Sequence, residues 1–131
     1  MDDDIRLGDR VCVVGPGPIA LMAIALAFRR GAAEVVCIGP RHATARLARA
    51  RELGAVLASD ECYGEFAWDA EAVSVLDPRV CDGDHTGLLA VHSVSKRSNA
   101  AGYRAGFVVG DVGLVQGLVG LRKHLGMMVP A

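Results

Sequence analysis

The chain has 131 residues, of which 52% are hydrophobic, 5% are aromatic and 22% are charged, and its formal net charge is −1. Such a length suits one domain, and the high apolar share leaves little room for long disordered tails. The near-neutral charge argues against a nucleic-acid-binding protein, which would show a concentrated basic face. The most apolar stretch, residues 19–28, is shorter than the ~20 residues of a membrane span, and the acidic residues 1–4 are unlike a secretory signal. We therefore expect a cytoplasmic protein whose partners include no membrane and no nucleic acid.

Predicted strands and helices alternate in the first half of the chain. Residues 11–14 and 34–38 are continuous apolar runs, which are typical of strands buried on both faces of a parallel sheet. A helix is predicted after each strand, over residues 18–30 and 43–53, and a glycine follows each helix. This order favours parallel strands joined by right-handed crossovers, and thus an α/β fold.

The second half of the chain predicts three more strands and a closing helix. The link over residues 95–102 is too short and polar for a crossover helix, so we expect the last two strands to pair antiparallel. Residues 63–84 show the least periodicity and predict a loop. The strands are residues 56–61, 87–93 and 104–110, and the helix covers residues 112–125.

Four cysteines lie about 20 to 25 residues apart, and none belongs to a Cys-x-x-Cys pair. This spacing favours buried free thiols, with disulfides or a metal site as the alternatives. The four are Cys12, Cys37, Cys62 and Cys81.

The histidines form no pattern of metal ligands. His42 is interpreted as a loop or cap residue and His92 as a core histidine with its hydrogen bonds satisfied. His85 and His124 are interpreted as surface residues. Residues 82–84 hold two acids in a turn, which is far short of a calcium-binding loop. We therefore expect no bound metal.

A glycine-rich turn follows the first predicted strand and opens the first predicted helix. Gly15-Pro-Gly17-Pro-Ile-Ala20 fits the pattern G-x-G-x-x-G/A. In that pattern the first glycine makes a tight turn, the second lets a diphosphate approach the backbone, and the third small residue lets the helix pack on the strand. The N-terminus of the helix would favour an anion. A tight turn without a ligand also needs glycine, so both interpretations stay open.

The surroundings of this turn resemble the cofactor domain of zinc-dependent medium-chain alcohol dehydrogenases. The resemblance covers about residues 5–55 and is carried by Gly-Asp-Arg-Val-Cys-Val-Val-Gly-Pro-Gly-Pro-Ile at residues 8–19 and Ala-Arg-Ala-Arg-Glu-Leu-Gly-Ala at residues 48–55. It implies that Gly15, Gly17 and Ala20 contact a dinucleotide.

The same resemblance implies NADP rather than NAD as the dinucleotide. The family usually ends its second strand in an aspartate that holds the ribose, whereas this chain has Gly39-Pro40-Arg41. Arg41 would then meet the 2′-phosphate. Nothing in the chain matches the family's catalytic zinc ligands, which lie in a separate domain, so we do not expect hydride transfer to an alcohol.

A second constellation lies in the other half of the chain. Ser-Asp-Glu-Cys-Tyr at residues 59–63 and His-Ser-Val-Ser-Lys-Arg-Ser-Asn-Ala-Ala-Gly-Tyr-Arg-Ala-Gly at residues 92–106 resemble fold-type I, pyridoxal-phosphate-dependent aminotransferases of class I/II. The match is close to the succinyldiaminopimelate transaminase group and runs from about residue 57 to the end. The alternative is that these residues are merely polar strand ends.

This resemblance implies a role for each matching residue. Asp60 would face the pyridine nitrogen of pyridoxal phosphate and Tyr63 would hydrogen-bond the phenolate oxygen of its ring. Lys96 would be the Schiff-base lysine. Ser93 and Arg104 would hold the phosphate. Other parts of the family's site match nothing in this chain, so we expect Lys96 to be a vestigial Schiff-base position.

The two resemblances meet at about residues 55–57, which predicts a chimera, engineered rather than naturally recombined. We expect one Rossmann-like domain over residues 1–131, with a dehydrogenase-like segment at 1–55 and an aminotransferase-like segment at 56–131. Both families have three-layer α/β folds. A mostly parallel sheet of strand order 2-1-3-4-5, with strand five antiparallel at one edge, would satisfy the crossover rule.

Three functional hypotheses follow. The main one is a fold-design protein that has no turnover of its own and requires no cofactor. The first alternative is a residual binder of NADP or another anion at the turn from Gly15 to Ala20. The second is an aminotransferase-like fragment that binds pyridoxal phosphate through Lys96. Self-association through the exposed edge of the sheet is expected as a further property.

Overall fold

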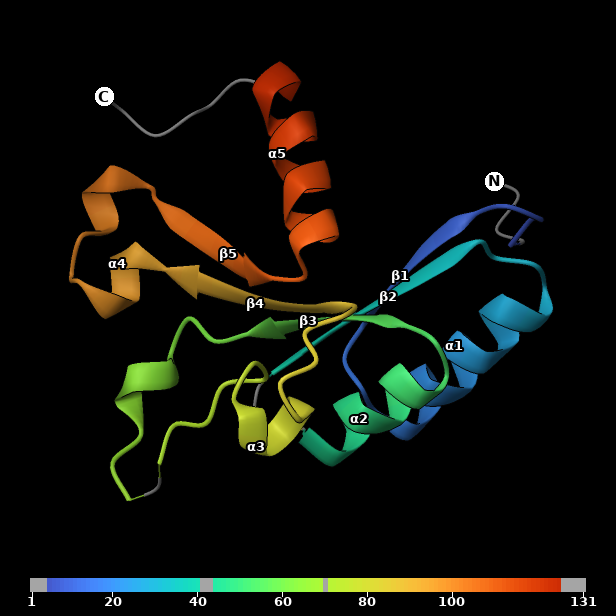
Figure 1. Cartoon of the computed structure of the whole chain (residues 1–131), viewed down its shortest axis with the longest axis horizontal. Helices are drawn as coiled ribbons and strands as arrows, with labels where there is room; N and C mark the ends of the chain where they lie inside the picture. Colours follow the sequence, from blue (N-terminus) through green and yellow to red (C-terminus); the bar gives the residue numbers. More distant parts are fainter. Residues whose placement is uncertain (1–4, 41–43, 70, 126–131) are drawn as a thin grey trace. The chain divides into compact units, whose positions relative to one another are not determined.

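The structure is a computed structural model that describes residues 5–40, 44–69 and 71–125 (Figure 1). Five strands form a sheet in the order β1-β2-β3-β4-β5. The chain divides into two compact units, Met1–Ala58 and Ser59–Ala131, and the division falls within β3 (Val56–Asp60). The expected α/β class with a mostly parallel sheet is confirmed. Each unit is described by itself.

The first unit is a strand–helix–strand–helix arrangement that leads into β3. β1 (Arg10–Val14) and β2 (Glu34–Pro40) pair in parallel, in a register from Arg10 opposite Glu34 to Val14 opposite Ile38. Between them runs α1 (Pro18–Arg29), which has Gly17 at its N-cap and a proline in its first turn. α2 (Thr44–Glu52) follows β2. These bounds lie close to the predicted ones because the apolar periodicity that carries them is local.

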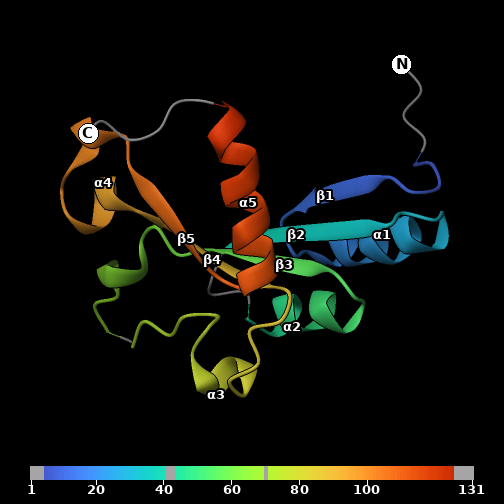
Figure 2. The same ribbon diagram turned by 45° about the horizontal axis from the view of Figure 1, so that its top comes forward.

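The predicted strand order 2-1-3-4-5 is wrong, because β1 is an outer strand and β2 lies between β1 and β3. In the predicted order the chain would reverse its direction across the sheet after the second strand, and this reversal would have placed the first two helices on opposite faces of the sheet. Instead α1 and α2 contact each other and lie on the same side of β1 and β2 (Figures 1 and 2). Two right-handed crossovers that advance in the same direction produce this arrangement.

The core of the first unit is built from small and branched apolar side chains between the two helices and the strands. Ile24 of α1 is completely buried, and the side chains of β2 alternate between buried and half-buried positions. The opposite face of β1 stays open, since Cys12 is exposed and Val14 is 79% exposed. The buried apolar side chains of this unit are Ile24, Ala27, Ala32, Val35, Cys37, Leu47, Ala50, Ala55, Leu57 and Ala58.

The second unit continues from the end of β3 through several short elements to a hairpin-like pair. β4 (Leu88–Ser93) and β5 (Gly106–Gly110) pair antiparallel, from Leu89 opposite Gly110 to Ser93 opposite Gly106, which confirms the expected direction of strand five. The last element of the described residues is α5 (Val112–Leu125), which has the predicted bounds. β5 is an outer strand, so self-association through this edge stays a prediction.

Short helical segments occupy regions that were expected to be loop or link. They hold three or four residues each, which is too little chain for a periodic pattern to show. The sequence did carry a signal for one of them, because Asp77 caps α3 through its side chain and Pro78 is the first residue of that helix. The segments are η2 (Gly64–Phe66), α3 (Pro78–Cys81), α4 (Val94–Arg97) and η3 (Ala101–Tyr103).

All four cysteines are free thiols, as predicted. The expected burial is confirmed for Cys37 and Cys81 but is wrong for Cys62, which is half-buried, and for Cys12, which is exposed on the open face of the outer strand β1. Within residues 5–40, 44–69 and 71–125, no three histidine, cysteine or acidic side chains gather where they could hold a metal ion. No helix in these ranges has the length and apolarity needed to cross a membrane.

Candidate functional site

Apart from Arg104, the predicted site residues of the second unit lie at or just beyond the ends of two neighbouring strands. Asp60 is the last residue of β3, and Tyr63 follows it just before η2. Ser93 is the last residue of β4 and also the N-cap of α4, which contains Lys96. Beyond β3, the amide N–H of Glu61 donates to the carbonyl oxygen of Val91 over 2.9 Å. The two segments therefore lie side by side.

The amine and the phenol of the predicted site meet across these segments. Lys96 Nζ lies 5.2 Å from the centroid of the Tyr63 ring, within the range of a cation–π interaction. The ring of Phe66 meets that of Tyr63 edge-on, with 5.9 Å between their centroids. Lys96 is exposed and Tyr63 is 60% exposed, so both groups are open to a ligand from solvent.

Asp60 interacts with Cys62, which lies close to Lys96. Asp60 Oδ1 accepts a hydrogen bond of 3.1 Å from the backbone N–H of Cys62. The pKa of the Cys62 thiol is raised to about 11: burial is the largest cause, a hydrogen bond to Asp60 and the negative charge of Asp60 also raise it, and the positive charge of Lys96 lowers it. A carboxylate, a thiol, an ammonium group and a phenol are thus gathered at one end of β3.

The titration of Cys62 tests this geometry directly. We expect Asp60→Asn to lower the pKa of Cys62 from about 11 toward its ordinary value of 9.0, because the variant removes the negative charge that disfavours the thiolate. Lys96→Met should raise the same pKa, because the variant removes an opposing positive charge. The pH dependence of thiol alkylation at Cys62, followed by mass spectrometry in a Cys12→Ser background, measures both effects. An unchanged Cys62 pKa in both variants would contradict the described arrangement.

The two predicted phosphate ligands are placed differently. Ser93 stands at the start of α4, and its hydroxyl group makes no capping bond to that helix. Arg104 ends η3 in a left-handed conformation with φ of 49°, and its Nη1 donates to the carbonyl oxygen of Ala101 over 3.2 Å. The structure thus brings Asp60, Tyr63 and Lys96 together, whereas the described hydrogen bond of Arg104 is made to its own short helix.

The glycine turn lies in the first unit. Gly15 has a φ of +89°, and its N–H donates to the carbonyl oxygen of Ile38 over 2.7 Å, as a tight strand-to-helix turn requires. A Cβ atom added at Gly15 or Gly17 would meet nothing within 4 Å, so the space beside both residues is open. Ala20 lies in the first turn of α1, and Arg41 lies outside the described residues. Binding of NADP or an anion here stays a prediction.

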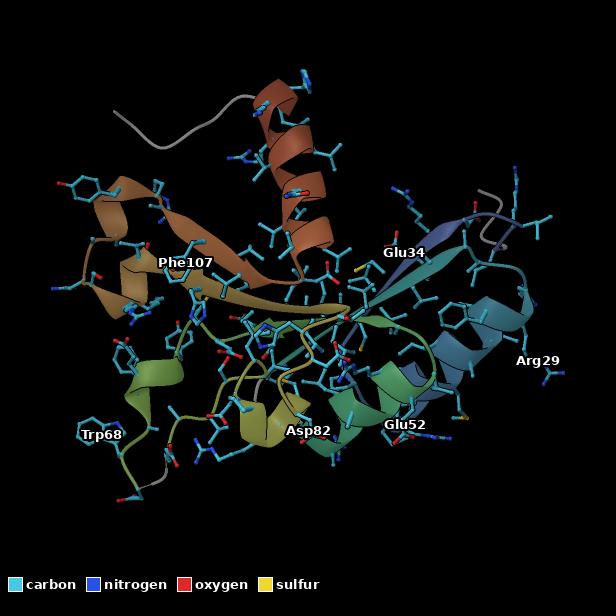
Figure 3. All side chains as sticks on the ribbon, in the orientation of Figure 1. Arg29, Glu34, Glu52, Trp68, Asp82 and Phe107 are labelled. Carbon is cyan, nitrogen blue, oxygen red and sulfur yellow. The ribbon has the colours of Figure 1, made fainter. Side chains whose placement is uncertain are left out.

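Two residues beside the predicted site form a pair that the sequence analysis did not foresee. Glu61 is 5% exposed, and its Oε2 lies 3.8 Å from Nε2 of His92. His92 was expected to be a satisfied core histidine, and it stacks on Phe107, which is marked in Figure 3. Side chains alternate between the two sides of an extended backbone. Adjacent acids at the end of a buried strand therefore signal that one of them points inward.

Comparison with known proteins identifies the family. The aminotransferase class I and II family matches residues 40–127. A probable aminotransferase of Mycobacterium tuberculosis is 62% identical over 94 residues, which cover 72% of this chain and 22% of that protein. An aminotransferase structure from Neisseria meningitidis covers 92% of this chain and 40% of its own, with a TM-score of 0.64 and 21% identity, and it supports the fold alone.

A dehydrogenase is also similar to this chain. Rat sorbitol dehydrogenase is 34% identical over 99 residues, which cover 68% of this chain and 27% of that protein. The chain thus spans about a quarter of the length of these two curated relatives. The dehydrogenase similarity does not show that the chain is a chimera.

These findings support the aminotransferase alternative and not the main hypothesis of a fold-design protein. The family implies pyridoxal phosphate, so the expectation that no cofactor is required has no support. Because the family match covers more than half of its residues, this chain belongs to the class I and II aminotransferases.

Proposed function

We propose that this chain carries the pyridoxal-phosphate-binding part of a class I/II aminotransferase and that Lys96 is the covalent attachment point of the cofactor. The observation that carries the proposal is the position of Lys96 Nζ, 5.2 Å from the centroid of the Tyr63 ring. These residues belong to the two separate halves of the motif that resembles the family. Adjacent strands bring the halves together at one end of β3 and β4.

The chemistry of the side chains present fits the group. The aldehyde of pyridoxal phosphate reacts with an amine, and its phenolate oxygen accepts a hydrogen bond from a hydroxyl group. Its pyridine nitrogen pairs with a carboxylate, and its phosphate binds hydroxyl and cationic groups. Lys96, Tyr63 and Asp60 supply the first three of these groups within one neighbourhood. Ser93, at the start of the helix that holds Lys96, and Arg104 would supply the last.

Each residue would have a definite task in amino-group transfer. Bound pyridoxal phosphate accepts the electrons released when a bond to the α-carbon of an amino acid breaks. Asp60 would hold a proton on the pyridine nitrogen, because a carboxylate favours a nearby positive charge. The Tyr63 hydroxyl would donate to the phenolate oxygen and orient the ring. Lys96 Nζ, once displaced, would take a proton from the α-carbon and return it as a general base and acid.

The chain offers an internal control for covalent attachment, because Lys96 and Lys123 are its only lysines. We expect pyridoxal phosphate followed by borohydride reduction to label Lys96 several-fold more than Lys123, as measured by peptide mass spectrometry. Lys123 lies in the last turn of α5 and has no part in the proposed site. Lys123→Arg should leave the labelling of Lys96 unchanged, and Lys96→Arg should abolish the specific labelling. Equal labelling of the two lysines would contradict the proposal.

A further inference from the structure

Glu61 is a buried acid that binds two other parts of the second unit. Its Oε1 accepts a hydrogen bond of 2.8 Å from the backbone N–H of Val75, and its Oε2 lies 3.8 Å from Nε2 of His92. Its own N–H donates to the carbonyl oxygen of Val91. A buried carboxylate is costly unless it is hydrogen-bonded or paired, so these contacts fix where the Glu61 side chain can lie.

His92 is held from the other side. Its ring stacks on Phe107, its partner across the β4–β5 pair, with 4.8 Å between the ring centroids and 20° between the planes. The side chain of His92 is only 19% exposed. The contact between Glu61 and His92 therefore joins the residue after β3 to a ring that is already fixed between β4 and β5.

The contact between Glu61 and His92 matters because both residues are next to predicted site residues in the sequence. Glu61 follows Asp60 directly and precedes Tyr63 by two positions, while His92 precedes Ser93 directly and lies two residues before α4 and four before Lys96. We propose that Glu61 and His92 are a pair of positioning residues, which sets the spacing between the Asp60–Tyr63 segment and the Ser93–Lys96 segment. This inference rests on the proposed function, since the spacing matters for holding one cofactor between the two segments.

Three variants of the full chain test the pair. Glu61→Leu removes the acceptor for Val75 and the partner of His92. Glu61→Gln is the matched rescue, because its amide keeps an oxygen for the Val75 N–H and offers an N–H to His92. His92→Leu leaves the bond between Glu61 and Val75 in place and is the variant that should fold even where Glu61→Leu does not. Circular dichroism establishes which variants are folded.

The first measurement is the ratio of Lys96 to Lys123 labelling by pyridoxal phosphate and borohydride. We expect this ratio to fall several-fold in Glu61→Leu and in His92→Leu and to be retained in Glu61→Gln. A purely structural role would lower the melting temperature of the variants without changing the ratio in the folded protein. Retention of the wild-type ratio in folded His92→Leu would overturn the inference.

The second measurement needs no cofactor and separates the two proposals. If Glu61 and His92 hold Asp60 against Cys62, the pKa of Cys62 should fall from about 11 in Glu61→Leu and in His92→Leu, because the raising effect of Asp60 is lost, and stay high in Glu61→Gln. Should the wild-type chain show no preference for Lys96, the proposed function fails, and the Cys62 titration then decides the positioning role by itself. A Cys62 pKa that is the same in all folded variants would overturn that role.

Discussion

Gly110→Ala is expected to destabilise the β4–β5 pair by about 3 kcal/mol or more, from the combined costs of a strained backbone and an overpacked contact. Gly110 has a φ of +141°, which side chains other than hydrogen rarely allow. An added Cβ would collide with the carbonyl oxygen of Leu88 and lie 2.9 Å from its carbonyl carbon and 3.0 Å from Cα of Leu89. All three atoms are backbone of the paired strand, so no side-chain rotation relieves the contact.

Gly117→Ala is the matched control for Gly110→Ala. Gly117 lies within α5, where an added Cβ meets nothing within 4 Å. Alanine is preferred over glycine in a helix by ~1 kcal/mol, so this variant should be as stable as the wild-type chain or more so. Urea denaturation followed by circular dichroism measures both free energies of unfolding. Equal stability of the two variants would show that β4 and β5 are not paired in the described register.

The bounds of the long elements could be predicted because the signals for them are local. The closing helix was expected at residues 112–125 and is α5, Val112–Leu125. The second strand was expected at residues 34–38 and is β2, Glu34–Pro40. In both cases the pattern of apolar residues within one window of sequence, together with flanking glycine or proline, is enough to locate the element.

The order of the strands could not be predicted, because it depends on which way each crossover turns. An apolar run that is buried on both faces is the same whether its neighbour lies on one side or the other. The direction of the two crossovers goes with the packing of α1 against α2, which brings both helices to one side of β1 and β2. This packing also leaves Cys12 exposed on the open face of β1, although the sequence around Cys12 is as apolar as the sequence around the buried Cys37.

The candidate site was identified from a resemblance rather than from spacing. Asp60 and Lys96 are far apart in sequence, and only the adjacent placement of β3 and β4 brings their segments together. The adjacent acids Asp60 and Glu61 signalled that one of them points inward, but the partners of the buried Glu61 carboxylate could not be predicted, because tertiary structure sets them. Those partners, Val75 and His92, come from a long loop and a different strand.

Ile24→Ala is expected to destabilise the first unit by about 3 kcal/mol, because the substitution removes buried methyl and methylene groups and leaves a cavity. Ile24 is completely buried, whereas Ile19 in the same helix is 80% exposed. Ile19→Ala deletes the same atoms from the same element, and its effect should stay within ~0.5 kcal/mol. Alanine has a higher helix propensity than isoleucine, so a large loss of stability in Ile24→Ala alone would report on the packing of α1 on β1 and β2. Urea denaturation followed by circular dichroism measures the difference. Similar free energies of unfolding would mean that the face of α1 carrying Ile24 is not the face that packs on these strands.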